Sequence, residues 1–190
     1  MKDLKSNPPP FVAIDASTNS LAFAYFKDGE LIQFGKIKYF GTDIYDKIVD
    51  TAHKTKSFFD TFDSKNINNI VIEQVIYVNS PKTAANLAMS HGALVASAAI
   101  TGVQHIASVS PMVWQNWIGN KRLTVAEKDA IRHANPAKTN SWYKSQERQV
   151  RKQKTIKYVN DKFDIHLDDD DVADAVAIGA WTLENWNKVF

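Results

Sequence analysis

Four acidic residues occupy positions where the surrounding sequence predicts buried structure, and the first of them is Asp15. It lies in or at the end of the apolar segment 11–16, where alternation along a strand places Phe11, Ala13 and Asp15 on one face. A carboxylate on an apolar face is costly unless it is paired or binds a metal ion. The alternative is that Asp15 belongs to the polar turn at residues 17–20, as a turn or capping residue.

Glu73 is the second of these residues, and it directly follows the continuous apolar run 70–72. Such a run is typical of a strand buried on both faces, where a surface glutamate is not expected. Functional groups in sheets of this kind tend to lie at the ends of strands. The alternative is that the strand finishes early and leaves Glu73 in solvent.

Asp171 and Asp174 lie three residues apart in a segment that predicts a helix, so their side chains share one face. The sequence around them, residues 172–178, is otherwise apolar on all sides, as expected of a buried helix. Acidic residues at a helix start are favourable, which accounts for the run 168–171 but not for Asp174, one turn further on. Asp170, four residues before Asp174, could replace Asp171 in the pair.

Four carboxylates from three elements predict an oxygen-only site, which is the kind that Mg²⁺ and Mn²⁺ prefer. Two such ions about 4 Å apart can activate water and stabilise the leaving oxygen of a phosphodiester. Without metal the carboxylates repel one another and their pKa values rise, so metal binding should weaken at low pH. The chain has no cysteine and only five scattered histidines, which argues against disulfides, iron–sulfur clusters and zinc.

The elements that must position these side chains follow from hydrophobic periodicity. Strands are predicted at 11–16, 21–26, 31–40, 69–75 and 105–110, and helices at 41–63, 81–101, 111–117, 124–133, 141–163 and 168–186. Hairpin spacing makes the first three strands antiparallel, and alternation with helices makes the later ones parallel. The fold class is therefore α/β, with a five-stranded mixed sheet flanked by helices. Residues 1–10 are expected to form a disordered tail ahead of one domain, 11–190.

Charge is distributed unevenly along the chain. Segment 121–162 holds twelve basic and four acidic residues, a net of +8, while the rest carries a net of −6. A basic block beside an acidic body predicts a nucleic-acid surface. The alternative is a solvated, salt-bridged helix face. No apolar run is long enough to span a bilayer and no signal peptide is recognisable, so a cytoplasmic protein without a membrane partner is expected.

Three short motifs resemble those of the RuvC-type Holliday junction resolvases, in the ribonuclease H-like superfamily. They are Ile14-Asp15-Ala16-Ser17, Ile72-Glu73-Gln74-Val75 and Asp171-Val172-Ala173-Asp174-Ala175, in the same order, spacing and placement on elements. The small, cysteine-free form looks most like phage-encoded members, which would act in the host cytoplasm. The resemblance implies that Asp15 bridges two Mg²⁺ ions, that Glu73 holds one, and that Asp171 with Asp174 holds the other.

The resemblance also implies a homodimer that resolves branched DNA, mainly four-way junctions, by paired nicks. Helix 81–101 would then form much of the dimer interface through its small residues, whereas the alternative is ordinary packing on the sheet. Cellular members carry an aromatic wedge directly after Glu-Gln-Val. Here Ile76 occupies that position and Tyr77 follows, so either residue could enter the junction.

The basic segment supplies candidates for DNA contacts. These are Lys121, Arg122, Arg148, Arg151, Lys152 and Lys154. Arg148 lies roughly where the family has a functional lysine, whereas Trp114 or Gln115 replaces another lysine that the family carries after the fifth strand. Trp142 and Tyr143 lie among these charges and could stack on exposed bases or belong to the core.

Three other functions compete with the resolvase interpretation. One is a nuclease of the same superfamily that cuts RNA in RNA–DNA hybrids, although the Asp171–Asp174 pair favours the resolvase branch. Another is a sugar-kinase or actin-like ATPase, because segment 14–18 resembles the first phosphate loop of that fold. That fold needs two such domains and an adenosine-binding glycine motif, which a chain of 190 residues with seven glycines does not supply. The third is a non-catalytic module that binds branched DNA.

Overall fold

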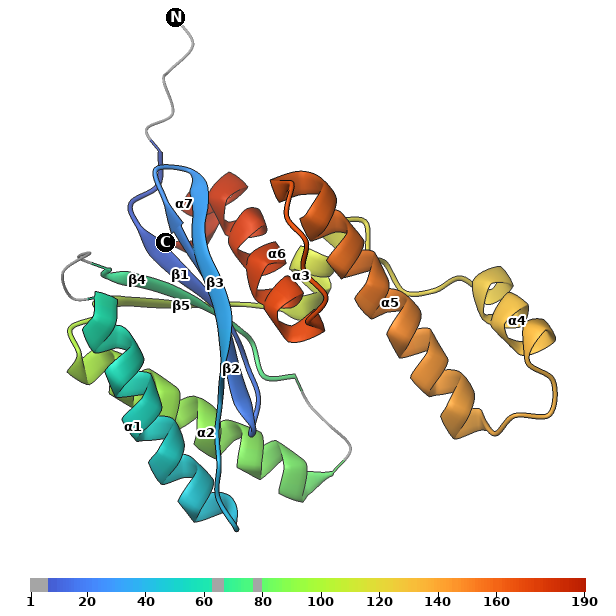
Figure 1. Cartoon of the computed structure of the whole chain (residues 1–190), viewed down its shortest axis with the longest axis horizontal. Helices are drawn as coiled ribbons and strands as arrows, with labels where there is room; N and C mark the ends of the chain where they lie inside the picture. The colour runs from blue at the N-terminus through green and yellow to red at the C-terminus, as the bar shows by residue number, and fades with distance from the viewer. Residues whose placement is uncertain (1–6, 63–66, 77–79) are drawn as a thin grey trace, which may run out of the picture.

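The computed structural model describes residues 7–62, 67–76 and 80–190, and it forms a mixed sheet covered by helices on both faces (Figure 1). The strands are β1 (Phe11–Ala16), β2 (Ser20–Lys27), β3 (Glu30–Lys38), β4 (Asn69–Glu73) and β5 (His105–Val109). Their order is β3-β2-β1-β4-β5, antiparallel among β1, β2 and β3 and parallel across β1, β4 and β5. The predicted α/β fold with a five-stranded mixed sheet is confirmed.

The helices begin and end close to the predicted residues. They are α1 (Ile44–Phe62), α2 (Pro81–Ile100), α3 (Pro111–Trp117), α4 (Val125–Ala134), α5 (Asn140–Phe163), α6 (Asp170–Glu184) and α7 (Trp186–Val189). The start of α6 was predicted two residues too early. Asp169 caps this helix, because its side chain accepts hydrogen bonds from the backbone N–H groups of Asp171 and Val172.

Alternating side chains of the central strands supply two separate cores. On β1, Val12 and Ile14 pack toward α1 and α2, whereas Phe11 and Ala13 pack toward α6. The helix α6 lies very close to the sheet, since a Cβ placed on Gly179 would come within 2.0 Å of the Phe26 ring. The amino end of α6 lies near the carboxyl ends of β1 and β4, since Asp171 and Asp174 line the same cleft as Asp15 and Glu73.

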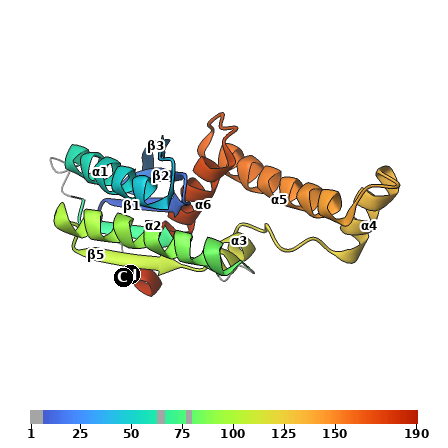
Figure 2. The same cartoon turned by 90° about the horizontal axis from the view of Figure 1, so that it is seen from below.

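Helices α4 and α5 form an arm that extends from the body, and Figure 2 shows it in profile. None of the residues of α4 is buried, and its first turn is closed by a capping box between Thr124 and Glu127. The hydroxyl of Tyr143 on α5 donates a 2.6 Å hydrogen bond to the carbonyl of Asn135. Tyr143 therefore holds the α4–α5 connection together, a structural role distinct from stacking on bases.

Helix α2 packs against α1 with one face and exposes much of the other. Its buried residues are Ser90, Leu94, Ser97 and Ala98, whereas Ala85, Ala88, Met89, Gly92 and Ala96 are exposed. The sequence of this helix left two roles open, a dimer interface and ordinary packing on the sheet. Packing within the single chain accounts for only one of its faces. In the described part of the chain no helix has the length and apolar character needed to cross a membrane.

Candidate active site

Asp15 and Glu73 lie at the carboxyl ends of two neighbouring parallel strands. The register pairs Ile14 of β1 with Ile72 of β4, so the acidic residues that follow them are brought side by side. Both share the strand face of Ala13 and Val71, which packs toward α6. The sheet thus directs two carboxylates toward the amino end of a third element.

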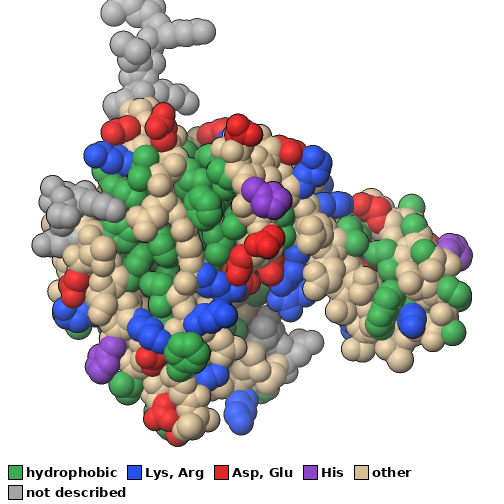
Figure 3. Space-filling model, in the orientation of Figure 1, with side chains coloured by type: hydrophobic (Ala, Val, Ile, Leu, Met, Phe, Trp, Pro, Cys, Tyr) green, Lys and Arg blue, Asp and Glu red, His purple; other side chains and the backbone are tan. Residues whose placement is uncertain are grey.

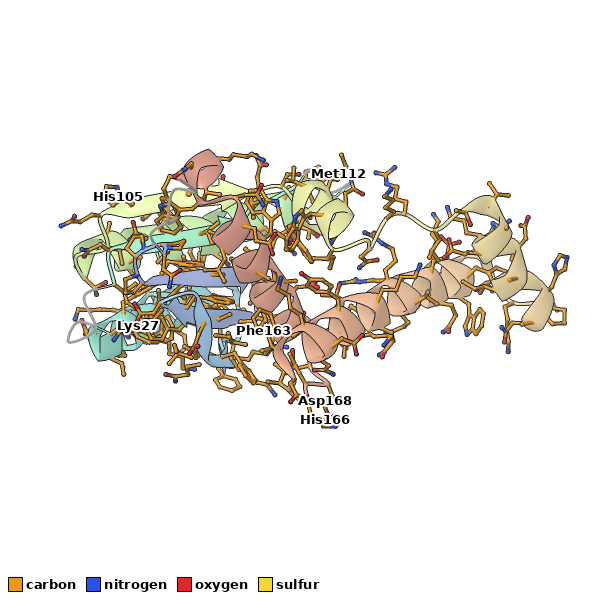
Figure 4. The ribbon with its side chains drawn as sticks, turned by 90° about the horizontal axis from the view of Figure 1, so that it is seen from above. Lys27, His105, Met112, Phe163, His166 and Asp168 are labelled. Atoms are coloured by element: carbon orange, nitrogen blue, oxygen red, sulfur yellow. The ribbon has the colours of Figure 1, made fainter. Side chains whose placement is uncertain are left out.

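That third element, α6, contributes the other acidic side chains. Asp170 and Asp171 lie in its first turn and Asp174 lies one turn further on. Asp168 does not take part, because it precedes the helix and is exposed with His166, and both point away from the molecule (Figure 4). The four acidic residues 168–171 therefore have three different positions. Asp168 is exposed to solvent, Asp169 caps α6, and Asp170 and Asp171 line the cleft.

The carboxylates perturb one another strongly. Burial, and then the charges of Glu73, Asp174, Asp171 and Asp170, raise the pKa of Asp15 well above its ordinary value. Burial and the charge of Glu73 raise the pKa of Asp174 to about 8, even though a hydrogen bond from Thr155 acts in the opposite direction. These shifts show a concentration of negative charge that the surrounding protein leaves partly unbalanced.

A buried tryptophan orients Glu73. Trp114 of α3 is 0% exposed, and its indole Nε1 donates a hydrogen bond of 2.8 Å to Oε1 of Glu73. Burial raises the pKa of Glu73, and this hydrogen bond acts in the opposite direction because it stabilises the charged form. Trp114, expected as one of two residues in place of a family lysine, is thus both a core residue and a partner of the site.

Two lysines neutralise the carboxylates at the start of α6. Lys36 of β3 contacts Oδ2 of Asp171 at 2.5 Å and Oδ2 of Asp169 at 3.1 Å, and Lys152 of α5 pairs with Asp170. Burial alone would raise the pKa of Asp170, but the hydrogen bond and charge of Lys152 outweigh it and lower the pKa. The charge pattern alone gave no indication of these pairs, and Lys36 lies outside the basic segment.

The carboxylates lie in a cleft of about 670 Å³ between the body and the arm. Figure 3 shows acidic and basic side chains gathered where these two parts meet. The basic residues that line the cleft are Arg122, Lys128, Lys144, Arg148, Arg151 and Lys152. A cleft lined by both carboxylates and cations can bind a polyanion through its basic side chains while its carboxylates remain available to a cation.

The predicted DNA-binding residues fall into three groups. Ile76, Arg122, Arg148, Arg151 and Lys152 line the cleft. Lys121 and Lys154 do not, and Lys154 pairs with Glu127 at 2.8 Å, in keeping with the salt-bridged alternative for this segment. Tyr77 lies outside the described residues.

The donor set of this cluster fits a hard divalent cation. It contains only carboxylate oxygens, and the raised pKa values of Asp15 and Asp174 indicate a site that a positive ion would stabilise. No three acidic or histidine side chains among residues 7–62, 67–76 and 80–190 converge closely enough to hold a metal ion. Three of the acidic side chains are instead held by other partners: Asp171 by Lys36, Asp170 by Lys152, and Glu73 by Trp114.

Comparisons with known proteins identify similar structures but no similar sequences. No family model matches the chain, and no curated protein matches it. Thermus thermophilus RuvC in complex with a Holliday junction substrate has a TM-score of 0.65 and 11% identity over 96% of this chain and 98% of that chain. A second Thermus thermophilus RuvC structure has a TM-score of 0.61 and 11% identity over 95% of this chain and 98% of that one.

A third similar structure is the yeast mitochondrial Holliday junction resolvase Ydc2. It has a TM-score of 0.49 and 16% identity, over 98% of this chain and 83% of that chain. The two bacterial structures match over nearly the whole length of both chains, and the mixed sheet with its flanking helices agrees with them. The chain therefore has the ribonuclease H-like fold that the RuvC structures share.

Proposed function

We propose that this protein is a metal-dependent endonuclease that resolves Holliday junctions and cuts other branched DNA by paired nicks. The proposal rests on one observation, which is that acidic and basic side chains line the same cleft. The acidic ones are Asp15, Glu73, Asp171 and Asp174. The fold shared with a RuvC structure that holds a Holliday junction substrate supports the choice of substrate. The function of a fold must be argued from its site, and here the site and the fold agree.

In this proposal the four carboxylates hold two Mg²⁺ ions, for which Mn²⁺ can substitute. Asp15 and Glu73 would hold them from the ends of β1 and β4, and Asp171 and Asp174 from the amino end of α6. When bound, the ions would activate water and stabilise charge on the leaving oxygen. In the structure Trp114 orients Glu73 by a hydrogen bond, and Lys36 balances the charge of Asp171.

The basic wall has a separate task, which is to hold the DNA backbone in the cleft. Arg148 and Lys144 lie on the α5 side of the cleft, and Arg122 lies in the connection to α4. Phosphate contacts of this kind position a duplex without reading its sequence. Ile76, 55% exposed, follows Glu73 on the same connection and is suited to an apolar contact with unstacked bases.

Paired nicks need two active sites, so we propose a homodimer. The exposed face of α2, rich in small side chains, permits the close approach of a second helix. A Cβ on Gly92 would meet nothing within 4 Å, so this face is open in the single chain. Sedimentation of the wild type and of a Gly92→Arg variant tests this part, and a wild type that sediments as a monomer would refute it.

The substrate class is tested with a panel of labelled nucleic acids in the presence of Mg²⁺. A mobile four-way junction, a replication fork, a linear duplex and an RNA–DNA hybrid are compared. Symmetrical nicks in the junction with an intact linear duplex are expected, and cleavage of the fork would extend the activity to other branches. Preferential cutting of the RNA strand in the hybrid would instead support the ribonuclease alternative.

A further inference from the structure

A network of hydrogen bonds lies next to the carboxylates and links residues of α3, α5 and α6. We call Gln115, Asn120, Arg151 and Thr155 the polar belt. All four side chains line the same cleft as the carboxylates. The belt begins next to Trp114, which holds Glu73, and it ends at Asp174, so it connects two acidic residues that come from different elements.

Asn120 is the centre of the polar belt. It is only 3% exposed, although it lies in the connection between α3 and α4. Its Nδ2 donates to the backbone carbonyl of Arg151 at 2.8 Å and to Oγ1 of Thr155 at 2.9 Å. One side chain therefore fastens this connection to α5 and at the same time holds a buried hydroxyl.

Arg151 completes the link to α3. Its Nη2 donates to Oε1 of Gln115 at 2.5 Å and to the backbone carbonyl of Asn120 at 3.4 Å. Within the described residues, Nε of Arg151 and Oδ1 of Asn120 are buried without a hydrogen-bond partner.

Thr155 has one hydroxyl proton, which its contact with Asn120 does not use. Its oxygen accepts the hydrogen bond from Asn120, so the proton is free for another acceptor. The Asp174 carboxyl lines the same cleft, and the Thr155 hydroxyl acts on it as a hydrogen-bond donor that lowers its pKa. Thr155 is 1% exposed, so very little of its surface is open to solvent.

We propose that Thr155, oriented by Asn120, is a positioning residue that fixes the Asp174 carboxylate and sets the affinity of the site for divalent cations. The inference rests on the proposed metal-dependent function, and it names two residues that set the affinity of the site for divalent cations. Groups that orient metal ligands through hydrogen bonds typically change metal affinity or activity by about 10- to 100-fold when removed. A threonine that served only packing would be replaceable by valine, which has nearly the same shape.

The test compares Thr155→Val, Thr155→Ser and Asn120→Ala by titration of Mn²⁺ into the DNA-free protein, followed by paramagnetic resonance of free Mn²⁺. We expect Thr155→Val to weaken Mn²⁺ binding about 10-fold and Asn120→Ala to act in the same direction. Thr155→Ser keeps the hydroxyl and should bind Mn²⁺ as the wild type does. In junction cleavage, Thr155→Val should need more Mg²⁺ for half-maximal rate at an unchanged KM for DNA.

Thr182→Val is the matched control, because Thr182 is a fully buried threonine of α6 whose hydroxyl donates to the carbonyl of Ile178. It should leave Mn²⁺ binding unchanged. Wild-type Mn²⁺ affinity in folded Thr155→Val, or no Mn²⁺ binding by the wild type, would overturn the inference. If the wild type binds Mn²⁺ but cuts no nucleic acid, the nuclease proposal fails while the Mn²⁺ comparison still decides the role of Thr155. Should Thr155→Val fail to fold by circular dichroism, Asn120→Ala decides.

Discussion

The indole nitrogen of Trp114 lies 2.8 Å from a carboxylate oxygen of Glu73, and the two residues are 41 positions apart in the chain. The hydrogen bond joins α3 to the end of β4 and selects one orientation of the glutamate. Ligand groups held in this way lose little freedom when an ion binds. This contact gives a buried aromatic residue a direct influence on the site.

Trp114→Phe keeps an aromatic ring in the core but removes the N–H donor. We expect this variant to fold and to lose about 10-fold in junction cleavage or in Mg²⁺ affinity, since Glu73 loses its orienting partner. Trp117→Phe is the control, because Trp117 packs against Tyr158 instead of touching the carboxylates. Equal activity of both variants in a cleavage assay would show that the Trp114 hydrogen bond is dispensable.

Asp174 makes the metal-free protein sensitive to pH. A carboxyl whose pKa rises from 3.8 to about 8 on folding binds its proton more tightly in the folded state. The free energy of unfolding should therefore fall as pH rises between these values. Asp174→Asn removes this penalty, and we expect its melting temperature at pH 8 without metal to exceed that of the wild type by about 5 °C.

The same measurement at pH 4 provides the control for Asp174→Asn. There Asp174 is protonated in the folded protein, so the two melting temperatures should nearly coincide. Added Mg²⁺ should raise the melting temperature of the wild type at pH 8 and should have less effect on the variant. A variant that is less stable than the wild type at pH 8 without metal would contradict the charge repulsion inferred here.

Lys36 competes with the cation that the site is proposed to bind. Because its ammonium contacts both Asp171 and Asp169, Lys36→Met should lower the melting temperature of the metal-free protein. It should also reduce severalfold the Mg²⁺ concentration needed for half-maximal cleavage, since Asp171 no longer has to leave a partner. Lys38→Met, on the same strand and exposed, is the control. A higher Mg²⁺ requirement in Lys36→Met would mean that Lys36 orients Asp171 for the metal.

Arg148 tests the basic wall of the cleft. Arg148→Gln should weaken junction binding and reduce by about one the slope of log K against log salt, as expected for the loss of one phosphate contact. Binding is measured in Ca²⁺ at several salt concentrations so that cleavage does not interfere. Lys56→Gln, on α1 and paired with Asp60, should leave the slope unchanged. Identical slopes for both variants would place the DNA elsewhere.

Most of the fold could be predicted from periodicity because each element has a clear local signal. The strand Phe11–Ala16 and the helix Pro111–Trp117 match the predicted bounds, and the Asp28–Gly29 turn joins β2 to β3 with positive φ at both residues. The end of β3 was misjudged, since it stops at Lys38 where the prediction continued to Phe40. The backbone N–H of Phe40 donates to the side chain of Asp50 instead of continuing the sheet.

The site was only partly predictable, because sequence patterns reveal anomalies but not partners. Asp15, Glu73 and Asp174 were conspicuous as carboxylates in apolar surroundings, and in the structure all three line one cleft. Lys36 and Thr155 had no such signal, since a lysine on an edge strand and a threonine in a polar helix are ordinary. Their roles depend on contacts between elements that are distant in sequence.

The central claim is that the carboxylates in this cleft cut branched DNA with the help of a divalent cation. The most direct measurement incubates a labelled four-way junction with wild-type protein or Asp15→Asn, with Mg²⁺ or with chelator, while binding is followed in parallel. We predict paired nicks by the wild type with Mg²⁺, and none by Asp15→Asn or with chelator, although the variant still binds the junction. Junction binding without cleavage by the wild type, or cleavage that persists in Asp15→Asn, would contradict the account.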